Sequence, residues 1–182
     1  MACLATFGGL VLYSQVGQAQ DNKPCNDNSE QCMISAATTY LDALVSHDAT
    51  HTRLDPTVMR TELGGNTGTG AQAIRQSVSI PTPDESIIDK RDVRWFVDKP
   101  NHEAVAFYIL DVGAEPNPPT FLPFVRPTTA TGTVHLSERF KVDNGLITQI
   151  EAIFAAGTHP CETDNWPPTE TSPVCPVLVN PF

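Results

Sequence analysis

Basic residues are scarce in this sequence, and their scarcity limits the partners that the protein can have. The 182 residues include 11 lysines and arginines against 21 aspartates and glutamates, which gives a formal net charge of -10 and a pI of about 4.7. DNA, RNA and anionic lipid surfaces are bound through a basic face, and this composition offers none. We therefore expect no nucleic-acid partner and no membrane partner.

Charged side chains are absent from residues 1–19, and this segment contains no apolar run that could span a bilayer. Its apolar stretch, residues 4–16, is shorter than the roughly 20 residues that a membrane-spanning helix needs. The small residues Gly17 and Ala19 have the spacing that signal peptidase accepts, so the segment predicts an export signal cleaved after Ala19. A positive charge at its start is lacking, which leaves a mis-assigned start or a buried first helix as the alternative. The expected location is secreted or periplasmic.

Cysteine is also uncommon, with five in the whole chain, and Cys3 would be removed with the export signal. The four cysteines that remain are an even number, as expected in an oxidising compartment. We expect them to form disulfides that cross-link the segments on the two flanks of the domain. Four cysteines can pair in three ways, and their spacing does not choose among these pairings. The cysteine spacings also do not match those of common zinc sites, so we expect no metal, and we expect no other cofactor. The predicted disulfide cysteines are Cys25, Cys32, Cys161 and Cys175.

The remaining composition is that of one globular domain. A hydrophobic content of 40% is enough for a core that needs no metal, and we place a single domain at residues 20–157. Residues 114–129 are rich in proline and form a stiffened connection, which either covers a pocket mouth, meets a partner chain or runs over the surface. Residues 158–182 form a second proline-rich stretch, which we interpret as a surface tail.

Hydrophobic periodicity predicts helices first and strands afterwards. Apolar residues recur at helical spacing in residues 33–45, and a short helix is expected at residues 71–78. Residues 54–63 suit a turn of helix followed by an extended segment. The glycine run at residues 64–70 reads as a loop, because it lacks the lysine of a phosphate-binding loop. From residue 91 the period changes to two, and strands are expected at residues 91–97, 103–110, 133–142 and 146–154, of which 103–110 is almost continuously apolar.

A tight turn joins the last two predicted strands. The sequence Asp143-Asn144-Gly145 accepts the positive φ angles that such turns need, so these strands form a hairpin. The predicted fold class is therefore α+β, with an antiparallel sheet and the helices packed on one of its sides.

Glu138 is the most informative residue of the sequence. It shares the strand register of Val134, Leu136, Phe140 and Val142, which places a carboxyl on the apolar face of its strand. An ionised carboxylate there is costly, so it must be paired, hydrogen-bonded or kept protonated by a raised pKa. Functional acids have these same properties. An edge position, a break in register or a salt bridge to Arg94 is the structural alternative.

Four short pieces of sequence carry a resemblance to a known group. They are TYLDAL at residues 39–44, GAQAIR at 70–75, ERFKV at 138–142 and EAIF at 151–154. In this order the chain resembles, over residues 33–156, the SnoaL-like and ketosteroid-isomerase branch of the nuclear-transport-factor-like superfamily. The resemblance implies a curved sheet forming a cone-shaped barrel around a pocket, and a sheet-to-sheet homodimer.

The resemblance also implies roles for particular residues. Tyr40 falls where steroid isomerases keep an oxyanion-hole tyrosine, although a tyrosine on a buried helix face is more often a core residue. Glu138 falls where they keep a protonated carboxylic acid that donates a second hydrogen bond. Their proton-shuttling aspartate falls on Thr61, so Glu62, one residue away, is the candidate base if the glycine loop differs by one residue.

Aromatic strand residues are the candidates for lining such a pocket, although strand aromatics are core residues first. We expect a small apolar molecule as the partner. One hypothesis is a cofactor-independent isomerase or cyclase acting on an apolar carbonyl compound. A dehydratase or epoxide-hydrolase-like enzyme and an exported non-catalytic binding or structural module are the alternatives. The predicted ligand-binding residues are Trp95, Phe107, Phe140 and Phe154, with Tyr108 nearby.

Overall fold

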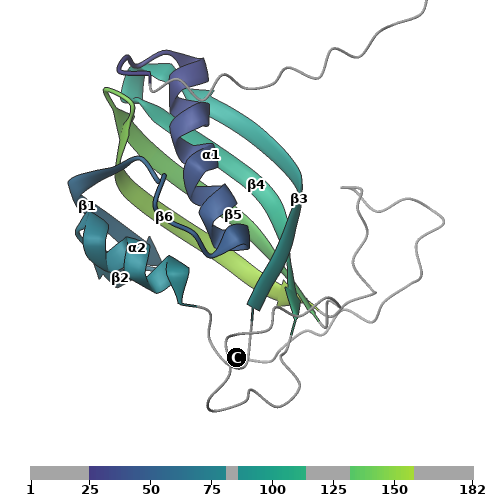
Figure 1. Cartoon of the computed structure of the whole chain (residues 1–182). Coiled ribbons are helices and arrows are strands. Elements are labelled where there is room, and N and C mark those ends of the chain that lie inside the picture. The colour runs from purple at the N-terminus through teal and green to yellow at the C-terminus, as the bar shows by residue number, and fades with distance from the viewer. Residues whose placement is uncertain (1–24, 81–85, 114–131, 158–182) are drawn as a thin grey trace, which may run out of the picture.

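The computed structural model of the protein describes residues 25–80, 86–113 and 132–157 (Figure 1). The predicted export signal, the connection at 114–129 and the tail with Cys161 and Cys175 lie outside the described residues. In chain order the elements are α1 (Glu30–Ser46), β1 (Leu54–Glu62), β2 (Gly65–Thr69), α2 (Ala71–Ser79), β3 (Ser86–Asp98), the short 3-10 helix η1 (Lys99–Asn101), β4 (Glu103–Gly113), β5 (Gly132–Asp143) and β6 (Leu146–Gly157).

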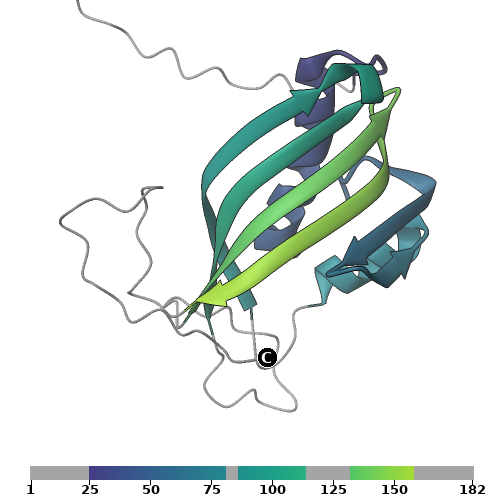
Figure 2. The same ribbon diagram turned by 180° about the vertical axis from the view of Figure 1, so that it is seen from behind.

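The six strands form one curved sheet in the order β2-β1-β6-β5-β4-β3, and the α+β prediction is confirmed. Helix α1 crosses one face of this sheet, and Figure 2 shows the opposite face of β3 to β6 from behind. Strands β2 and β3 lie at the two ends of the order. The sheet is therefore unclosed, and it differs in this respect from the cone-shaped barrel that the resemblance implied.

One pair of strands differs from the antiparallel arrangement that we predicted. Strand β1 pairs in parallel with β6, with Arg60 opposite Ile150 and Glu62 opposite Ala152. The pair is extended by the Leu63 amide, which donates to the carbonyl of Ala152 at 2.9 Å. Parallel strands need a long crossover, and here the connection includes α2 and the strands β3 to β5. No turn motif in the sequence predicts the parallel pairing of β1 with β6.

The prediction for residues 54–70 was wrong in two places. Residues 54–62 form a complete strand without a preceding turn of helix, and Gly65–Thr69 forms the strand β2, where we expected a loop. Leu63 and Gly64, with φ angles of 50° and 81°, make the tight turn that brings β2 back antiparallel to β1. Pairing with β1 therefore outweighs the low strand propensity of glycine.

Helix α1 begins three residues before its predicted start because of a side-chain cap. The Ser29 hydroxyl accepts a hydrogen bond from the Cys32 amide at 3.2 Å, which satisfies one of the unpaired amides of the first turn. Cys32 also forms a disulfide with Cys25, a pairing that the sequence had left open. The disulfide thus anchors the start of the helix that crosses the sheet.

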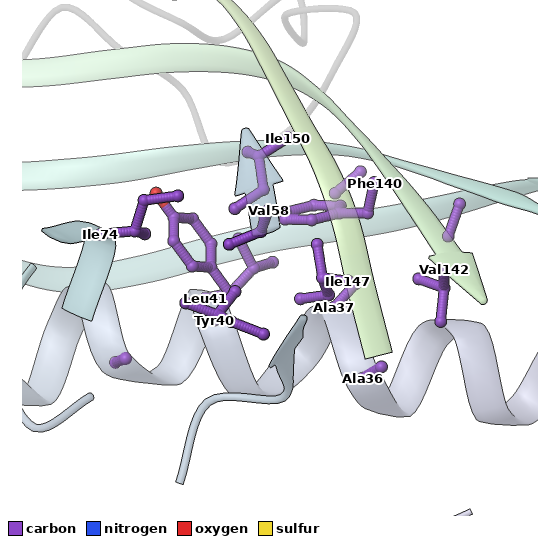
Figure 3. Packing of buried hydrophobic residues seen from close by; sticks show 14 of the residues in the cluster. Ala36, Ala37, Tyr40, Leu41, Val58, Ile74, Phe140, Val142, Ile147 and Ile150 are labelled. Atoms are coloured by element: carbon purple, nitrogen blue, oxygen red, sulfur yellow. The ribbon is translucent and has the colours of Figure 1, made fainter. Parts of the chain in front are cut away.

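The core lies between α1, α2 and the covered face of the sheet (Figure 3). Tyr40 and Leu41 of α1 are fully buried there, and the Tyr40 ring packs edge-on against Phe140 of β5 at 5.7 Å between ring centres. Small residues such as Ala36 and Ala37 let the helix approach the strands closely. The other large side chains of this layer are Val58, Ile74, Val142, Ile147 and Ile150.

Candidate functional site

Glu138 lies on the covered face of β5, as its register predicts, and is 2% exposed. The salt bridge to Arg94 that we held as an alternative does not form. Arg94 instead pairs with Asp92, while Glu138 accepts a hydrogen bond from the Tyr108 hydroxyl at 2.6 Å. A carboxyl has therefore been enclosed in the core with a neutral donor as its hydrogen-bond partner.

The neighbouring strand supplies that donor. Ala106 of β4 lies directly opposite Glu138, so Tyr108, two residues farther along β4, projects from the same face. Tyr108 is itself buried, and burial together with the negative charge of Glu138 raises its pKa well above the ordinary value. Tyr108 therefore remains protonated and can donate at any physiological pH.

The surroundings of Glu138 hold it close to half-protonated at neutral pH. Burial is the largest cause and raises its pKa from 4.5 to about 7. The hydrogen bond from Tyr108 opposes this change, the negative charge of Glu62 adds to it, and the positive charge of Arg60 again opposes it. This carboxyl can consequently give or take a proton in the physiological range.

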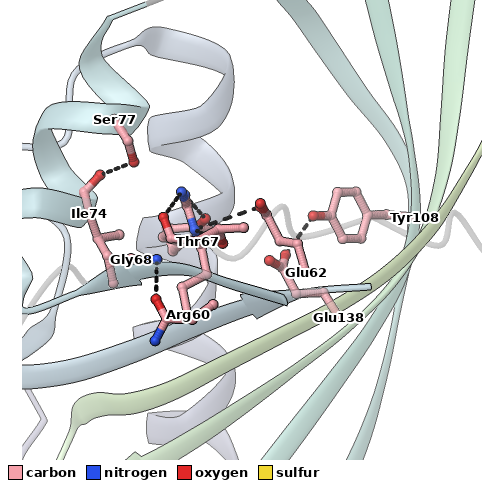
Figure 4. A network of polar contacts seen from close by, with 10 residues as sticks. Arg60, Glu62, Thr67, Gly68, Ile74, Ser77, Tyr108 and Glu138 are labelled. Carbon is pink, nitrogen blue, oxygen red and sulfur yellow. Dashed lines mark hydrogen bonds and ion pairs between the residues drawn. The ribbon is translucent and has the colours of Figure 1, made fainter. Parts of the chain in front are cut away.

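Arg60 connects the other polar residues of the inner face (Figure 4). It follows Val58 in the inward register of β1 and is mostly buried. Its Nε donates to the Thr67 hydroxyl at 3.1 Å, its Nη2 to the Thr67 carbonyl at 3.1 Å, and its Nη1 to the Tyr40 hydroxyl at 3.2 Å. Two strands and α1 are thereby joined through one guanidinium group.

Glu62 completes the group from the end of β1. Its carboxylate lies 3.7 Å from Arg60 Nε, and its side chain is 32% exposed. The Glu62 side chain is therefore the part of the group that solvent reaches, whereas Tyr40 and Glu138 lie deeper. Burial, followed by the negative charge of Glu138, raises the pKa of Tyr40 and keeps it protonated.

The predicted residues Tyr40, Glu62 and Glu138 thus lie in one region, with Arg60 in contact with the first two. We refer to these three residues with Arg60 and Tyr108 as the inner polar cluster. Sequence reasoning missed the part played by Arg60 and did not connect Tyr108 with Glu138. Arg60 and Glu62 are two residues apart on a strand, which is a signal that could have been read, because such spacing puts both on one face.

The four predicted ligand-binding aromatics are not brought together. Phe140 is fully buried and Trp95 packs near it, with 6.3 Å between ring centres, so both belong to the core beneath α1. Phe107 instead borders a groove of about 550 Å³ on the other side of the sheet, whereas Phe154, which pairs with Leu136, shares the face of Glu138 near the end of β6 and is 38% exposed. Phe107 points away from Glu138 because its neighbour Ala106 is the residue paired with Glu138.

Two other kinds of site are absent from residues 25–80, 86–113 and 132–157. No group of three or more histidine, cysteine or acidic side chains could hold a metal ion there. No helix among these residues is long and apolar enough to cross a membrane.

Comparisons with known proteins agree with the resemblance seen in the sequence. Residues 26–154 match the protein family described as "Domain of unknown function (DUF8021)". No curated protein matches the sequence. Among solved structures, a LEH-like epoxide hydrolase from M. tuberculosis is 15% identical with a TM-score of 0.51, over 68% of this chain and 83% of that chain.

Two further solved structures have similar scores. A proposed polyketide cyclase from Silicibacter sp. TM1040 is 18% identical with a TM-score of 0.53, over 69% of this chain and 90% of that chain. A proposed isomerase from Bacillus subtilis is 10% identical with a TM-score of 0.52, over 69% and 87% of the two chains. At these identities the comparison concerns the fold alone, which is that of the SnoaL-like and nuclear-transport-factor-like proteins.

Proposed function

The chain belongs to the family described as "Domain of unknown function (DUF8021)", and from its inner polar cluster we propose that it catalyses proton transfer on a small apolar carbonyl compound without a cofactor. The observation that carries this proposal is the enclosed carboxyl of Glu138, with a pKa of about 7 and a hydrogen bond from Tyr108. Buried acids of this kind are uncommon outside functional sites.

The cluster contains two carboxyls in different surroundings, which is the arrangement that acid–base catalysis requires. Glu62 forms an ion pair with Arg60 and is partly exposed, so it is suited to act as the base. Glu138 is enclosed and protonated in half of the molecules near neutral pH, so it is suited to act as the acid. The two roles agree with those that the resemblance implied.

The reaction proceeds as follows. Glu62 removes a proton from the carbon beside the substrate carbonyl, and the electron pair of that C–H bond forms a C=C bond while the carbonyl oxygen becomes negative. Protonated Glu138 donates a hydrogen bond or its proton to this oxygen. Tyr40 is a second donor, because its oxygen accepts from Arg60, which leaves the hydroxyl hydrogen of Tyr40 to donate. Protonated Glu62 then returns the proton to another carbon of the conjugated system while the C=O bond re-forms, and any proton that Glu138 gave to the oxygen returns to Glu138, which gives the isomer.

The proposal can be tested with a β,γ-unsaturated cyclic ketone, whose conjugated product absorbs in the near ultraviolet. We expect Glu138→Gln and Glu62→Gln each to lower turnover by about a hundredfold or more, within the range usual for an acid or base. Glu151→Gln is the matched control, since Glu151 is an exposed carboxylate paired with Arg139. Turnover that survives both changes in the cluster would refute the proposal.

Hydrolysis of an epoxide is a second candidate, supported by the position of Arg60 among the carboxyls and tyrosines of the cluster. Glu62 would take a proton from water, the resulting hydroxide would attack an epoxide carbon, and Glu138 would protonate the oxygen released as the C–O bond breaks. Styrene oxide is a suitable probe, with diol formation as the readout. Non-catalytic binding is the third candidate, and it predicts a retained apolar ligand in native mass spectrometry.

The cellular setting of this function is also a proposal. The disulfide between Cys25 and Cys32 suits an oxidising compartment. We propose that the protein is exported, with residues 1–19 as the signal, 20–157 as the domain and 158–182 as a tail. Amino-terminal sequencing of the secreted protein tests this directly. The homodimer remains a prediction for sedimentation analysis.

A further inference from the structure

The turn between β1 and β2 contains a residue that its backbone conformation disfavours. Leu63 and Gly64 form this turn, since Glu62 pairs with Gly65, and their φ angles are 50° and 81°. Two positive φ angles define a turn for which Asn-Gly, Asp-Gly and Gly-Gly are the preferred pairs. A leucine at positive φ is an outlier, because its Cβ lies too close to the backbone carbonyl in that conformation. Leucine therefore lowers the stability of this turn.

The protein contains a second turn of the same kind, and that turn has the preferred residues. Strands β5 and β6 are joined by Asn144 and Gly145, whose φ angles are 50° and 77°. The two turns thus have nearly the same backbone, but only the second carries the Asn-Gly pair that such a backbone favours. The turn with leucine directly follows Glu62, the candidate base.

Packing in the core does not account for the leucine, because Leu63 is 61% exposed. Its printed hydrogen bond also does not require a leucine side chain, since the Leu63 amide donates to the Ala152 carbonyl at 2.9 Å. Asparagine would form this backbone hydrogen bond equally well. A strained residue that the fold does not need is a reason to look for a functional contact.

The hydrogen bond to Ala152 places this turn at the border of the inner polar cluster. Ala152 pairs with Glu62 on one side and with Glu138 on the other, so the three residues form one row across β1, β6 and β5. Both carboxyls belong to the polar group in Figure 4. Strands β1 and β6 run in parallel, so Leu63 lies beside the residues that follow Ala152. Among these, Phe154 shares the face of Glu138 and is 38% exposed, so an apolar border lies beside Glu62.

We propose that Leu63 is a specificity-determining residue, which contacts the apolar part of the substrate while Glu62 acts on the carbon beside the carbonyl. The inference rests on the proposed function for the position of the reacting group. It adds that the substrate extends from its carbonyl group toward the β1–β2 turn as a hydrocarbon, because the carboxylate of Glu62 repels an anionic extension. The stability lost in the turn is then offset by substrate binding, as occurs where activity and stability make opposite demands.

The test compares the full chain with two variants that exchange the residues of the two turns, Leu63→Asn and Asn144→Leu. The probes are cyclohexanone and 4-phenylcyclohexanone, saturated ketones that differ by one phenyl ring, and their binding is measured by NMR titration. Leu63→Asn should weaken binding of the larger ketone by about tenfold, since an apolar contact is lost, and leave binding of cyclohexanone unchanged. Asn144→Leu is the matched control and should leave binding of both ketones unchanged.

Thermal unfolding of the same variants separates a substrate contact from a general structural role. Leu63→Asn should raise the melting temperature by about 2–4 °C, and Asn144→Leu should lower it by a similar amount, because asparagine tolerates a positive φ angle better than leucine does. A variant that is more stable and yet binds the larger ketone less tightly has not lost affinity through damage to the fold.

Four results would overturn the inference. They are no binding of the larger ketone to the wild type, equal binding of it to Leu63→Asn, an equal loss of affinity for both ketones, and a melting temperature of Leu63→Asn that does not rise. Failure of the proposed function gives a different result. Selective loss of the larger ketone without turnover of an unsaturated ketone would refute catalysis alone, whereas turnover with unchanged binding in Leu63→Asn would refute the role of Leu63 alone.

Discussion

Replacing Glu138 by glutamine should make the protein more stable at alkaline pH and leave it unchanged at acid pH. The pKa of this carboxyl is about 7 in the folded chain against an ordinary value of 4.5. Below pH 4.5 the group is protonated in both states and has no effect. As the pH rises, the unfolded chain loses its proton first, so the folded chain becomes relatively less stable until the pH exceeds the folded pKa. Glutamine does not titrate and can still accept the hydrogen bond from Tyr108.

The size of the effect follows from the two pKa values. Their difference corresponds to about 3 kcal/mol in the free energy of unfolding. This is a large part of the total stability of a typical domain, about 5–15 kcal/mol. Glu138→Gln should therefore match the wild type at about pH 4 and exceed it by about 3 kcal/mol at about pH 8.5.

Urea unfolding at several pH values measures this difference directly. The wild type, Glu138→Gln and Glu151→Gln are compared, and the difference between variants cancels the titration of all other groups. Glu151→Gln should follow the wild type at every pH, because its side chain is exposed. If the difference between wild type and Glu138→Gln stays constant from acid to alkaline pH, Glu138 has an ordinary pKa and its proposed role as an acid fails.

Three further predictions use other parts of the structure. Tyr108→Phe removes the hydrogen bond at 2.6 Å, so a carbon-detected NMR titration should find the pKa of the enclosed carboxyl above 7, and an unchanged or lower value would contradict this. Gly145→Ala should lower the melting temperature more than Gly64→Ala does. Both glycines have positive φ, but a new Cβ at Gly145 would lie 2.1 Å from the Cys25 carbonyl oxygen, whereas one at Gly64 would meet nothing within 4 Å. Equal losses in the two variants would refute this contact. Replacing Cys25 and Cys32 by serine should cost about 2–3 kcal/mol in urea unfolding, and reduction of the wild type should reproduce the loss.

The sequence was sufficient for features that depend on one strand or one turn. The inward position of Glu138 follows from the two-residue period of β5 alone, and the turn at Asn144 and Gly145 follows from its residue types. The α+β class needed only the order of helical and strand periods. In each case the information lies within about ten consecutive residues.

Features that join distant segments could not be predicted in the same way. The contact between Arg60 and Tyr40 depends on how α1 lies over β1, and the parallel pairing of β1 with β6 has no local signal. The position of Phe107 on the face opposite Glu138 also depends on how β4 pairs with β5, which the sequence of one strand does not reveal. A single strand pattern reveals which residues share a face, but not which face meets the helix.

The pairing of β1 with β6 also affects how the chain folds as it leaves the ribosome. Strands β1 and β2 are consecutive in the chain and pair as a hairpin, but the other edge of β1 has its partner in β6, the last strand in sequence. This edge of β1 therefore stays unpaired until Leu146 and the residues after it have been synthesised. Premature pairing with another nascent chain is the hazard of such a delay. A substitution that slows formation of the last hairpin should therefore reduce yield before it reduces the stability of the finished protein.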